Sequence, residues 1–400
     1  MLEAIVGPRI VAGDRVLSDH AVLVQNGLFL DVVPRRALPS TARVREMGDG
    51  LLTPGLVDIH CHGAGGAGFT DGKANAFTRA LLRLLEGGVT TVLPTLVSAP
   101  LPKLETALET VAKLSGSVDL PRIPGAHLEG PYFSARQSGA QDTSTFRSPD
   151  DGSIDGILEH RRSIKMMSLA PELPDAPHLT AQLVDAGIVP AAGHSDCSDE
   201  DLYRCQRAGL SHVIHIFSGQ STTTRRGAWR QAGLLEATLA SDSLTVEMIA
   251  DGKHLPPTLM ALAYRCLKGR LCAVSDSTPG AGLPEGSRYN LGEREYIVEG
   301  GVGMTPDRLS FAGSTTLIGQ MIPILIGTLK MGVAEAVAMV TSIPARAAHL
   351  DDVGTIQVGM KADMVLFSDQ FQVLDVALGG EWVSPSTRSG RTHLNATATQ

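Results

Sequence analysis

Imidazole and carboxylate side chains recur along this chain where apolar segments end. The stretch LVDIHCHGAGG (56–66) carries His60 and His62 two residues apart, so both side chains share one face of an extended strand. The same residue types end later apolar segments, namely His127, Glu129, His194, His215 and Asp276. Imidazole and carboxylate are ligands of zinc and ferrous iron, and catalytic sites leave a position open for water. We therefore predict a catalytic divalent-metal site.

One apolar segment contains two histidines that are candidates for this set. In SHVIHIF (211–217), His212 and His215 are three residues apart and fall on opposite faces of a strand. We therefore expect only one of them to point inward, and the position near the strand end favours His215. Buried ionisable groups are costly unless they are paired or bind metal, so core filling explains the whole set poorly.

A glycine cluster follows the first histidine pair. Gly63, Gly65 and Gly68 match G-x-G-x-x-G, the pattern of a dinucleotide-binding loop. That loop also needs a helix opening at the glycines and an acid at the end of the next strand, which here ends in VLPTL. The glycines are better explained as letting the backbone approach a metal or substrate closely.

Eight apolar segments alternate with helical patterns and could position these side chains. The segments are 55–62, 89–96, 123–130, 164–172, 187–195, 211–218, 244–254 and 271–277. One helical pattern consists of Phe77, Ala80, Leu81, Leu84 and Leu85, and Ser198 is a candidate N-cap for another helix. This alternation predicts an α/β fold, a (β/α)8 TIM-type barrel over residues 53–352, with its chemistry at the C-terminal strand ends.

The two ends of the chain lack the alternation of apolar segments and helical patterns found in the middle. Residues 1–52 and 353–400 show short strands and turns, so we expect one small β-sandwich accessory domain built from both ends. The tail from about residue 385 has the composition of a disordered segment.

Composition excludes several classes of function. The net charge is −8 and aromatic residues make up 4%, which argues against nucleic acid and anionic membrane as partners. We expect no signal peptide and no transmembrane helix, because neither pattern is found. Five cysteines without a C-x-x-C pair fit a reducing compartment. We predict a cytoplasmic protein that acts on a small molecule.

The motifs taken together resemble a known family. PGLVDIHCHGAGG (54–66), GAHLEGPYFS (125–134), AAGHSDCS (191–198), IADGKH (249–254) and VSDSTPGAG (274–282) stand in its order. The chain resembles the N-acetylglucosamine-6-phosphate deacetylases of the amidohydrolase superfamily, as a divergent member. The resemblance implies a barrel with a small β-sandwich and a homodimer. It also implies one or two divalent ions per subunit, with zinc the first choice and iron or manganese as alternatives.

The resemblance also assigns the metal ligands. Glu129, His194 and His215 match the ligands of the main metal, and His60 and His62 match the pair that can hold a second ion. The same residues were selected above by their positions at strand ends.

Other positions correspond to catalytic and substrate-binding residues. Asp276 matches the catalytic acid/base, and His254 matches a histidine that contacts the substrate. Gln141 stands where the family commonly has a substrate-contacting histidine, and Ser218 and Gly219 replace an Asn-Ala pair after the last histidine ligand. We expect all three to contact the substrate as well.

The resemblance implies a metal-dependent amide hydrolase that deacetylates N-acetylglucosamine 6-phosphate or a related N-acyl amino sugar. Arg226 falls where the family has an arginine, so we expect it to hold an anionic group of the substrate. Two alternatives remain. One is a divergent amidohydrolase that acts on another amide in a specialised pathway, and the other is a non-catalytic sugar-binding barrel.

Overall fold

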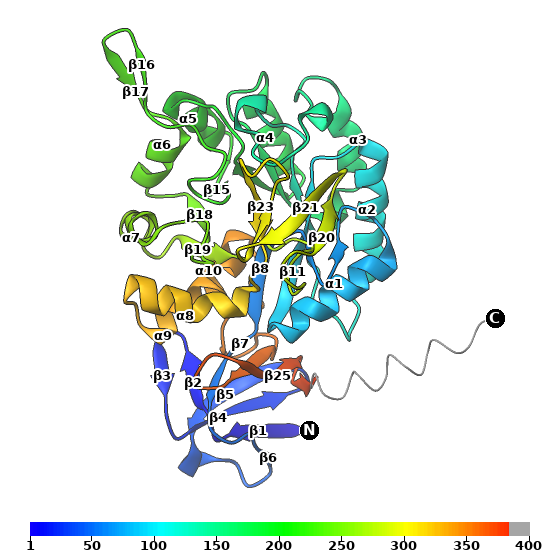
Figure 1. Cartoon of the computed structure of the whole chain (residues 1–400). Helices are drawn as coiled ribbons and strands as arrows, with labels where there is room; N and C mark the ends of the chain where they lie inside the picture. Colours follow the sequence, from blue (N-terminus) through cyan, green and yellow to red (C-terminus); the bar gives the residue numbers. More distant parts are fainter. Residues whose placement is uncertain (384–400) are drawn as a thin grey trace, which may run out of the picture.

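Eight parallel strands form one sheet whose order follows the chain (Figure 1). The strands are β8 Leu56–Cys61, β11 Val89–Val97, β12 Ala126–Glu129, β13 Ile164–Leu169, β14 Val189–Ala192, β15 His212–Val213, β18 Thr245–Ile249 and β19 Leu271–Val274. Each overlaps one of the eight expected segments, and the barrel prediction is confirmed. The computed structural model describes residues 1–383, so the predicted disordered tail lies outside the described residues.

The sheet is nearly closed, because residues just after its last strand, β19, bond to the end of its first strand, β8. The backbone N–H of Asp276 donates to the carbonyl oxygen of His60 at 2.9 Å, and Cys61 forms a parallel bridge with Ser277. Residues from the beginning and the end of the barrel sequence are therefore neighbours.

Helices follow the strands around the barrel. They are α1 Ala74–Glu86, α2 Leu101–Leu114, α3 Ser153–Glu159, α4 Ala176–Asp185, α5 Asp199–Arg207, α6 Leu234–Ala240, α7 Pro257–Cys266, α8 Ile318–Leu329, α9 Val333–Met339 and α10 Ser342–Ala347. Four short 3-10 helices cover Arg35–Ala37, Ala135–Gln137, Thr143–Thr145 and Arg161–Ser163. No helix in residues 1–383 combines the length and the hydropathy that crossing a membrane requires.

Two helices show how local sequence sets their ends. The predicted apolar positions of α1 are all buried, and the helix stops at Gly87. The N-cap of α5 is Ser198, as expected, and it forms a capping box with Asp201, whose carboxylate accepts from the Ser198 N–H. Acidic residues in that first turn also complement the helix dipole.

Two small sheets built from both chain ends pack together below the barrel in Figure 1. The strands are β1 Leu2–Val6, β2 Arg9–Ala12, β3 Arg15–Leu17, β4 His20–Gln25, β5 Leu28–Pro34, β6 Arg43–Glu46, β7 Leu51–Pro54, β24 Met364–Phe367, β25 Val373–Leu378 and β26 Glu381–Trp382. Antiparallel pairing of β24 with β7 joins the C-terminal strands to the N-terminal ones. Ile5, Phe29, Leu52 and Met364 belong to the core of this unit. The expected accessory sheets are therefore present.

Three further pairings were not expected from the sequence. They are the hairpin of β9 Gly63–Ala64 with β10 Ala67–Gly68, the hairpin of β16 Thr224–Arg226 with β17 Trp229–Gln231, and the sheet of β20 Arg288–Leu291, β21 Arg294–Glu299, β22 Val302–Met304 and β23 Phe311–Ser314. In Figure 1 the β16–β17 hairpin projects away from the barrel.

The first hairpin explains the glycine cluster after the histidine pair. At Gly63 (φ 152°) an added Cβ would lie 2.1 Å from the carbonyl oxygen of Ala67, so only glycine fits there. The next helix opens at Ala74 rather than at the glycines, so the loop lacks the geometry of a dinucleotide site.

Candidate metal centre

Six side chains converge where the strands of the barrel end. Glu129 is the last residue of β12, and His60 and His62 lie at the end of β8. His194, His215 and Asp276 each stand two residues beyond β14, β15 and β19, with φ values of 44°, 22° and 45°. Positive φ is uncommon for residues other than glycine, and such strained positions cluster at functional sites. At each of them the side chain reaches the group, since His194 and His215 contact Glu129 and Asp276 contacts His62.

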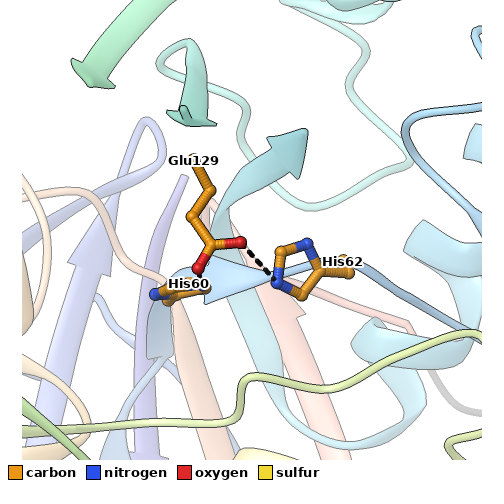
Figure 2. Close-up of side chains that lie close together, drawn as sticks. All are labelled: His60, His62 and Glu129. Atoms are coloured by element: carbon orange, nitrogen blue, oxygen red, sulfur yellow. Dashed lines mark ion pairs between the residues drawn. The ribbon is translucent and has the colours of Figure 1, made fainter. Parts of the chain in front are cut away.

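The carboxylate of Glu129 lies at the centre of the group. Its Oε1 accepts hydrogen bonds from Nε2 of His194 and Nε2 of His215, both at 3.0 Å. Its oxygens also lie 3.6 Å from Nε2 of His60 and 3.5 Å from Nε2 of His62. Figure 2 shows these two imidazoles from β8 on either side of the carboxylate, as expected for residues that share one strand face.

Hydrogen bonds behind the rings orient two of the histidines. Nδ1 of His194 donates to the carbonyl oxygen of Gln137 at 2.8 Å, and Nδ1 of His62 lies 3.3 Å from the carbonyl oxygen of Thr95. Each ring therefore turns its Nε2 toward Glu129. Metal-binding histidines are commonly held this way, with the nitrogen away from the metal donating to an oxygen.

Charge pairing stabilises the ionised form of both carboxylates. Burial alone would raise the pKa of Glu129, but hydrogen bonds from His194 and His215 hold that pKa well below its usual range. Burial likewise opposes ionisation of Asp276, but the hydrogen bond from His62 and the charges of the nearby histidines together outweigh burial and lower the pKa. Both groups are thus available as anionic oxygen donors.

The interior of the barrel holds a buried carboxylate that the sequence prediction missed. Glu247, in the middle of β18, is fully buried and accepts from Nδ1 of His60 at 2.8 Å and from Nε2 of His212 at 3.0 Å. Burial by itself would lower the pKa of His60, but the charge and hydrogen bond of Glu247, together with the charges of Glu129 and Asp276, outweigh burial and raise the pKa to about 10. No sequence signal separates this glutamate from one on a surface strand.

The expectation that only one of His212 and His215 points inward is wrong. Strand β15 ends at Val213, so the alternation of faces stops before His215. The positive φ at His215 then returns its side chain to the interior. His212 binds Glu247 inside the barrel, and His215 binds Glu129 at its end.

His127 packs edge-on against His60, with ring centroids 4.7 Å apart, and makes a separate pair of bonds. Its ring nitrogens contact the carbonyl oxygen of Ile59 at 3.1 Å and Oγ of Ser168 at 2.7 Å. Burial lowers the pKa of His127 to about 3, so the ring is neutral. A fully buried imidazole in this barrel can thus be satisfied without a carboxylate.

The donor set fits a divalent metal ion. Glu129, His194 and His215 offer atoms that all lie within 4.8 Å of one another, and so do His60, His62 and Glu129. Ligands at about 2.0–2.1 Å around a tetrahedral ion are roughly 3.4 Å apart, close to the separations found here. Nε2 of His60 is buried without a hydrogen-bond partner, which leaves a nitrogen free to bind an ion. The two clusters share Glu129, so the two candidate ion positions are neighbours.

A pocket opens above the metal-site residues. Its lining includes His62, Glu129, His194, His215 and Asp276, together with four predicted substrate-binding residues, which are Gln141, Ser218, Gly219 and His254. Strands β20–β23 and the turns between them supply a further wall that the sequence analysis did not anticipate, including Arg294, Tyr296 and Phe311.

Hydrogen bonds orient Gln141 and His254 in the pocket wall. Gln141 accepts the Ser98 N–H through Oε1 at 3.2 Å, while its Nε2 is buried without a partner. Nδ1 of His254 bonds to Asp251 at 2.7 Å, and the ring packs edge-on against Phe311 with centroids 5.1 Å apart. Both side chains thus have fixed orientations at the pocket wall.

Arg226 is not brought to this pocket. It is exposed on β16 in the projecting hairpin and is absent from the pocket lining within the chain. Among the pocket-lining residues of the described chain, Arg294 is the only arginine or lysine. Its Nη1 lies 3.4 Å from the carbonyl oxygen of Ala140, and its Nη2 lies 3.6 Å from Asp142.

Comparison with known proteins places this geometry in a family. A model described as the amidohydrolase family matches residues 51–383. The chain belongs to the amidohydrolase family. This amidohydrolase is therefore an enzyme that hydrolyses carbon–nitrogen bonds, and the family resemblance seen in the sequence is confirmed.

Characterised relatives match the amidohydrolase along almost its whole length. It is 30% identical to the N-acetylglucosamine-6-phosphate deacetylase of Vibrio furnissii, over 96% of this chain and 95% of the relative. It is 27% identical to the N-acetylgalactosamine-6-phosphate deacetylase of Escherichia coli O157:H7, over 94% of this chain and 98% of the relative.

Solved structures match it equally broadly. A variant of the Mycobacterium smegmatis N-acetyl-D-glucosamine-6-phosphate deacetylase, in complex with N-acetyl-D-glucosamine-6-phosphate, has a TM-score of 0.87 and 28% identity. That match covers 96% of this chain and 99% of the other. The Pasteurella multocida N-acetylglucosamine-6-phosphate deacetylase has a TM-score of 0.89, 23% identity and coverage of 96% and 100%, which shows the shared fold.

Proposed function

We propose that this amidohydrolase removes the acetyl group from a phosphorylated N-acetyl amino sugar, with N-acetylglucosamine 6-phosphate as the first candidate. The observation that carries the proposal is the convergence of Nε2 of His194 and His215 on one oxygen of Glu129, at the floor of a pocket that also contains Asp276. The names of the relatives support a phosphorylated amino sugar, and they include both gluco and galacto forms.

Glu129, His194 and His215 would hold the main divalent ion, and His60 and His62 would hold a second ion together with Glu129. We propose zinc as the resident ion, with iron or manganese as alternatives, because imidazole and carboxylate ligands suit all three metals. When bound, such an ion polarises an amide carbonyl and makes water acidic enough to attack near neutral pH.

Asp276 is the candidate general acid and base. Its carboxylate lines the pocket and lies beside His62, with 3.1 Å between Oδ1 and Nε2. In the proposed reaction Asp276 takes a proton from the attacking water and delivers it to the departing amine, so that the amide C–N bond breaks. Acetate and the free amino sugar are the products.

The pocket wall supplies groups to orient the sugar. The unpartnered Nε2 of Gln141 can donate to the acyl oxygen or to a sugar hydroxyl, and His254 is held by Asp251 for a similar contact. Gly219 leaves room beside His194, where a side chain would collide with the ring. Arg294 is in place to contact an anionic group of a substrate bound in this pocket.

Measurement of acetate release tests the function. N-acetylglucosamine 6-phosphate, its galacto isomer, unphosphorylated N-acetylglucosamine, N-acyl amino acids and cyclic amides should be assayed with zinc, iron and manganese. Acetate released fastest from a phosphorylated amino sugar supports the proposal. Turnover of another amide alone would favour the divergent amidohydrolase, and sugar binding without acetate release would favour the non-catalytic barrel.

We also propose that the enzyme acts as a homodimer in the cytoplasm, as the family resemblance and the cysteine usage led us to expect. Light scattering during size-exclusion chromatography measures the mass in solution. A mass of one chain would contradict the dimer.

A further inference from the structure

We propose that Glu247 is a positioning residue that prepares His60 to bind the second metal ion. The inference rests on the proposed function only in requiring that the site binds metal. Glu247 is fully buried on β18, two strands away from β8 around the closed barrel, and the proposed reaction gives it no role.

Both oxygens of the Glu247 carboxylate are engaged. Oε2 accepts from Nδ1 of His60 at 2.8 Å and from the backbone N–H of His215 at 3.2 Å. Oε1 accepts from Nε2 of His212 at 3.0 Å. A single carboxylate thus joins the histidine of the second-ion cluster to the backbone of a histidine from the main-ion cluster.

The bond to His60 determines which ring nitrogen is free. Because Nδ1 donates to Glu247, Nε2 is the ring nitrogen that can give up its proton and bind a metal ion. That nitrogen has no hydrogen-bond partner, and it lies 3.6 Å from both Oε1 of Glu129 and Oδ1 of Asp276. A carboxylate behind a metal-binding histidine fixes the tautomer and strengthens the ring as a ligand.

Glu247 also holds the turn that carries His215. Its backbone carbonyl oxygen accepts from the N–H of Ile216 at 2.8 Å, on the residue next to the strained position at φ 22°. The side-chain bond to the His215 N–H and this backbone bond flank the turn on both sides. Glu247 therefore sets the relative placement of the two metal clusters.

The simpler explanation is that Glu247 only satisfies His212, whose Nδ1 already bonds to Oγ1 of Thr245 at 2.7 Å. His127 argues against this explanation. It is equally buried, yet the neutral groups Ser168 Oγ and Ile59 carbonyl satisfy it. A buried negative charge is costly, so its presence against His60 calls for a role that a neutral acceptor would not fill.

The test compares metal content across four variants. Glu247→Ala removes the carboxylate, and Glu247→Gln keeps its shape without charge. His212→Gln disturbs the His212 bonds to Glu247 and Thr245 but leaves the bond between Glu247 and His60 in place, and His62→Ala removes a proposed ligand. Each metal-free protein is equilibrated with buffered zinc, and bound zinc per chain is measured by mass spectrometry. The melting temperature of the metal-free protein reports structural damage, and acetate release is measured on the same samples.

We expect two ions per chain in the wild type and in His212→Gln, and one in Glu247→Ala and His62→Ala. Glu247→Gln should bind the second ion ~10- to 100-fold more weakly, the usual effect of altering such a partner. Both Glu247→Ala and His212→Gln should lower the melting temperature. If Glu247 had only a structural role, the two variants would therefore bind the same number of zinc ions per chain. Glu247→Gln decides the question if Glu247→Ala does not fold.

Three results would overturn the inference. They are unchanged zinc affinity in both Glu247 variants, equal loss of zinc in the Glu247 and His212 variants, and a wild type that binds only one ion. In each case acetate release by the wild type would still support the proposed hydrolase, so the two proposals fail separately.

Discussion

Oδ1 of Asp276 lies 3.1 Å from Nε2 of His62, although the two residues stand at opposite ends of the barrel sequence. The contact arises because the barrel closes between β8 and β19, where the Asp276 N–H donates to the carbonyl oxygen of His60. The candidate proton-transfer group and the candidate second-ion ligands are thus neighbours through barrel closure.

Replacing Asp276 should separate catalysis from metal binding. Asp276→Asn keeps the shape of the side chain but removes the proton acceptor, so we expect kcat to fall at least ~100-fold while metal content and melting temperature are retained. Asp369→Asn, which changes an exposed acid paired with Arg9 in the accessory sheets, is the matched control. Near-normal turnover by Asp276→Asn would refute its assigned role.

Removing the metal should abolish activity and lower stability together. Dialysis against a chelator should stop acetate release, and zinc should restore it. An ion whose free concentration is 100 times its Kd stabilises the folded state by about 2.7 kcal/mol. The melting temperature should therefore fall when the ion is removed. Glu129→Ala, which removes the proposed central ligand, should show neither restored activity nor the zinc-dependent rise in melting temperature. Activity that persists without any bound metal contradicts the metal assignment.

A methyl group beside His194 should weaken the main metal site. In Gly219→Ala the new Cβ would lie 2.8 Å from Nδ1 of His194 and 3.0 Å from the carbonyl oxygen of Gln137, in the path of the bond that joins them. We expect ~10- to 100-fold weaker zinc binding. Gly227→Ala is the control, because its φ of 63° is similar to the 56° of Gly219 but nothing lies near the added Cβ. Equal zinc affinities in the two variants would contradict this prediction.

Two arginines can be compared as the contact for the anionic group. Arg294 lines the pocket and Arg226 lies on the projecting hairpin, so Arg294→Ala should reduce the preference for the phosphorylated sugar by roughly tenfold or more, as loss of a charge-assisted bond would. The ratio of kcat/KM values with and without phosphate measures this. If Arg226→Ala reduces the ratio instead, the original prediction for Arg226 is right, and the hairpin reaches the pocket of a second copy.

An ion pair between the barrel and the accessory sheets should matter for stability. Nε and Nη2 of Arg122 donate to the two oxygens of Asp363 at 2.6 and 3.1 Å, and the Asp363 side chain is only 3% exposed. Arg122→Ala leaves that carboxylate buried without its cation, so we expect a loss of about 2 kcal/mol in the free energy of unfolding, discounted for the partial exposure of Arg122. Chemical denaturation measures the change, with the exposed Arg161→Ala as control. Equal stabilities of the two variants would count against this role.

The sequence was enough to predict the types of the site residues and the order in which the strands carry them. Parallel barrel strands must end on the same face, so a histidine or carboxylate at each of several strand ends meets the others whatever the loops do. For that reason Glu129, His194, His215 and the pair His60 and His62 could be chosen before any contact was known. The eight strands were recognisable because each lies in a short, mostly apolar segment that alternates with a helical pattern.

The prediction that His212 and His215 point to opposite faces was wrong because the strand that carries them is too short. Strand β15 has two residues, so the backbone had already turned before His215, and both histidines of the segment point inward. Glu247 was missed for a related reason. A glutamate inside a strand reads as a solvent-facing residue unless the curvature of the closed barrel is known.

The sequence by itself determined which chemical groups this amidohydrolase carries and in which order its strands present them, because strand periodicity and strand-end chemistry are local. Tertiary structure decided which further groups join the strand-end residues and which residues stay away from them. Closure of the barrel brings Asp276 to His62, the sheet of β20–β23 brings Arg294 to the pocket, and the β16–β17 hairpin carries Arg226 away from it. These contacts join residues that are far apart in the chain. The distance between two such residues depends on the register and packing of every element between them, which local sequence patterns do not determine.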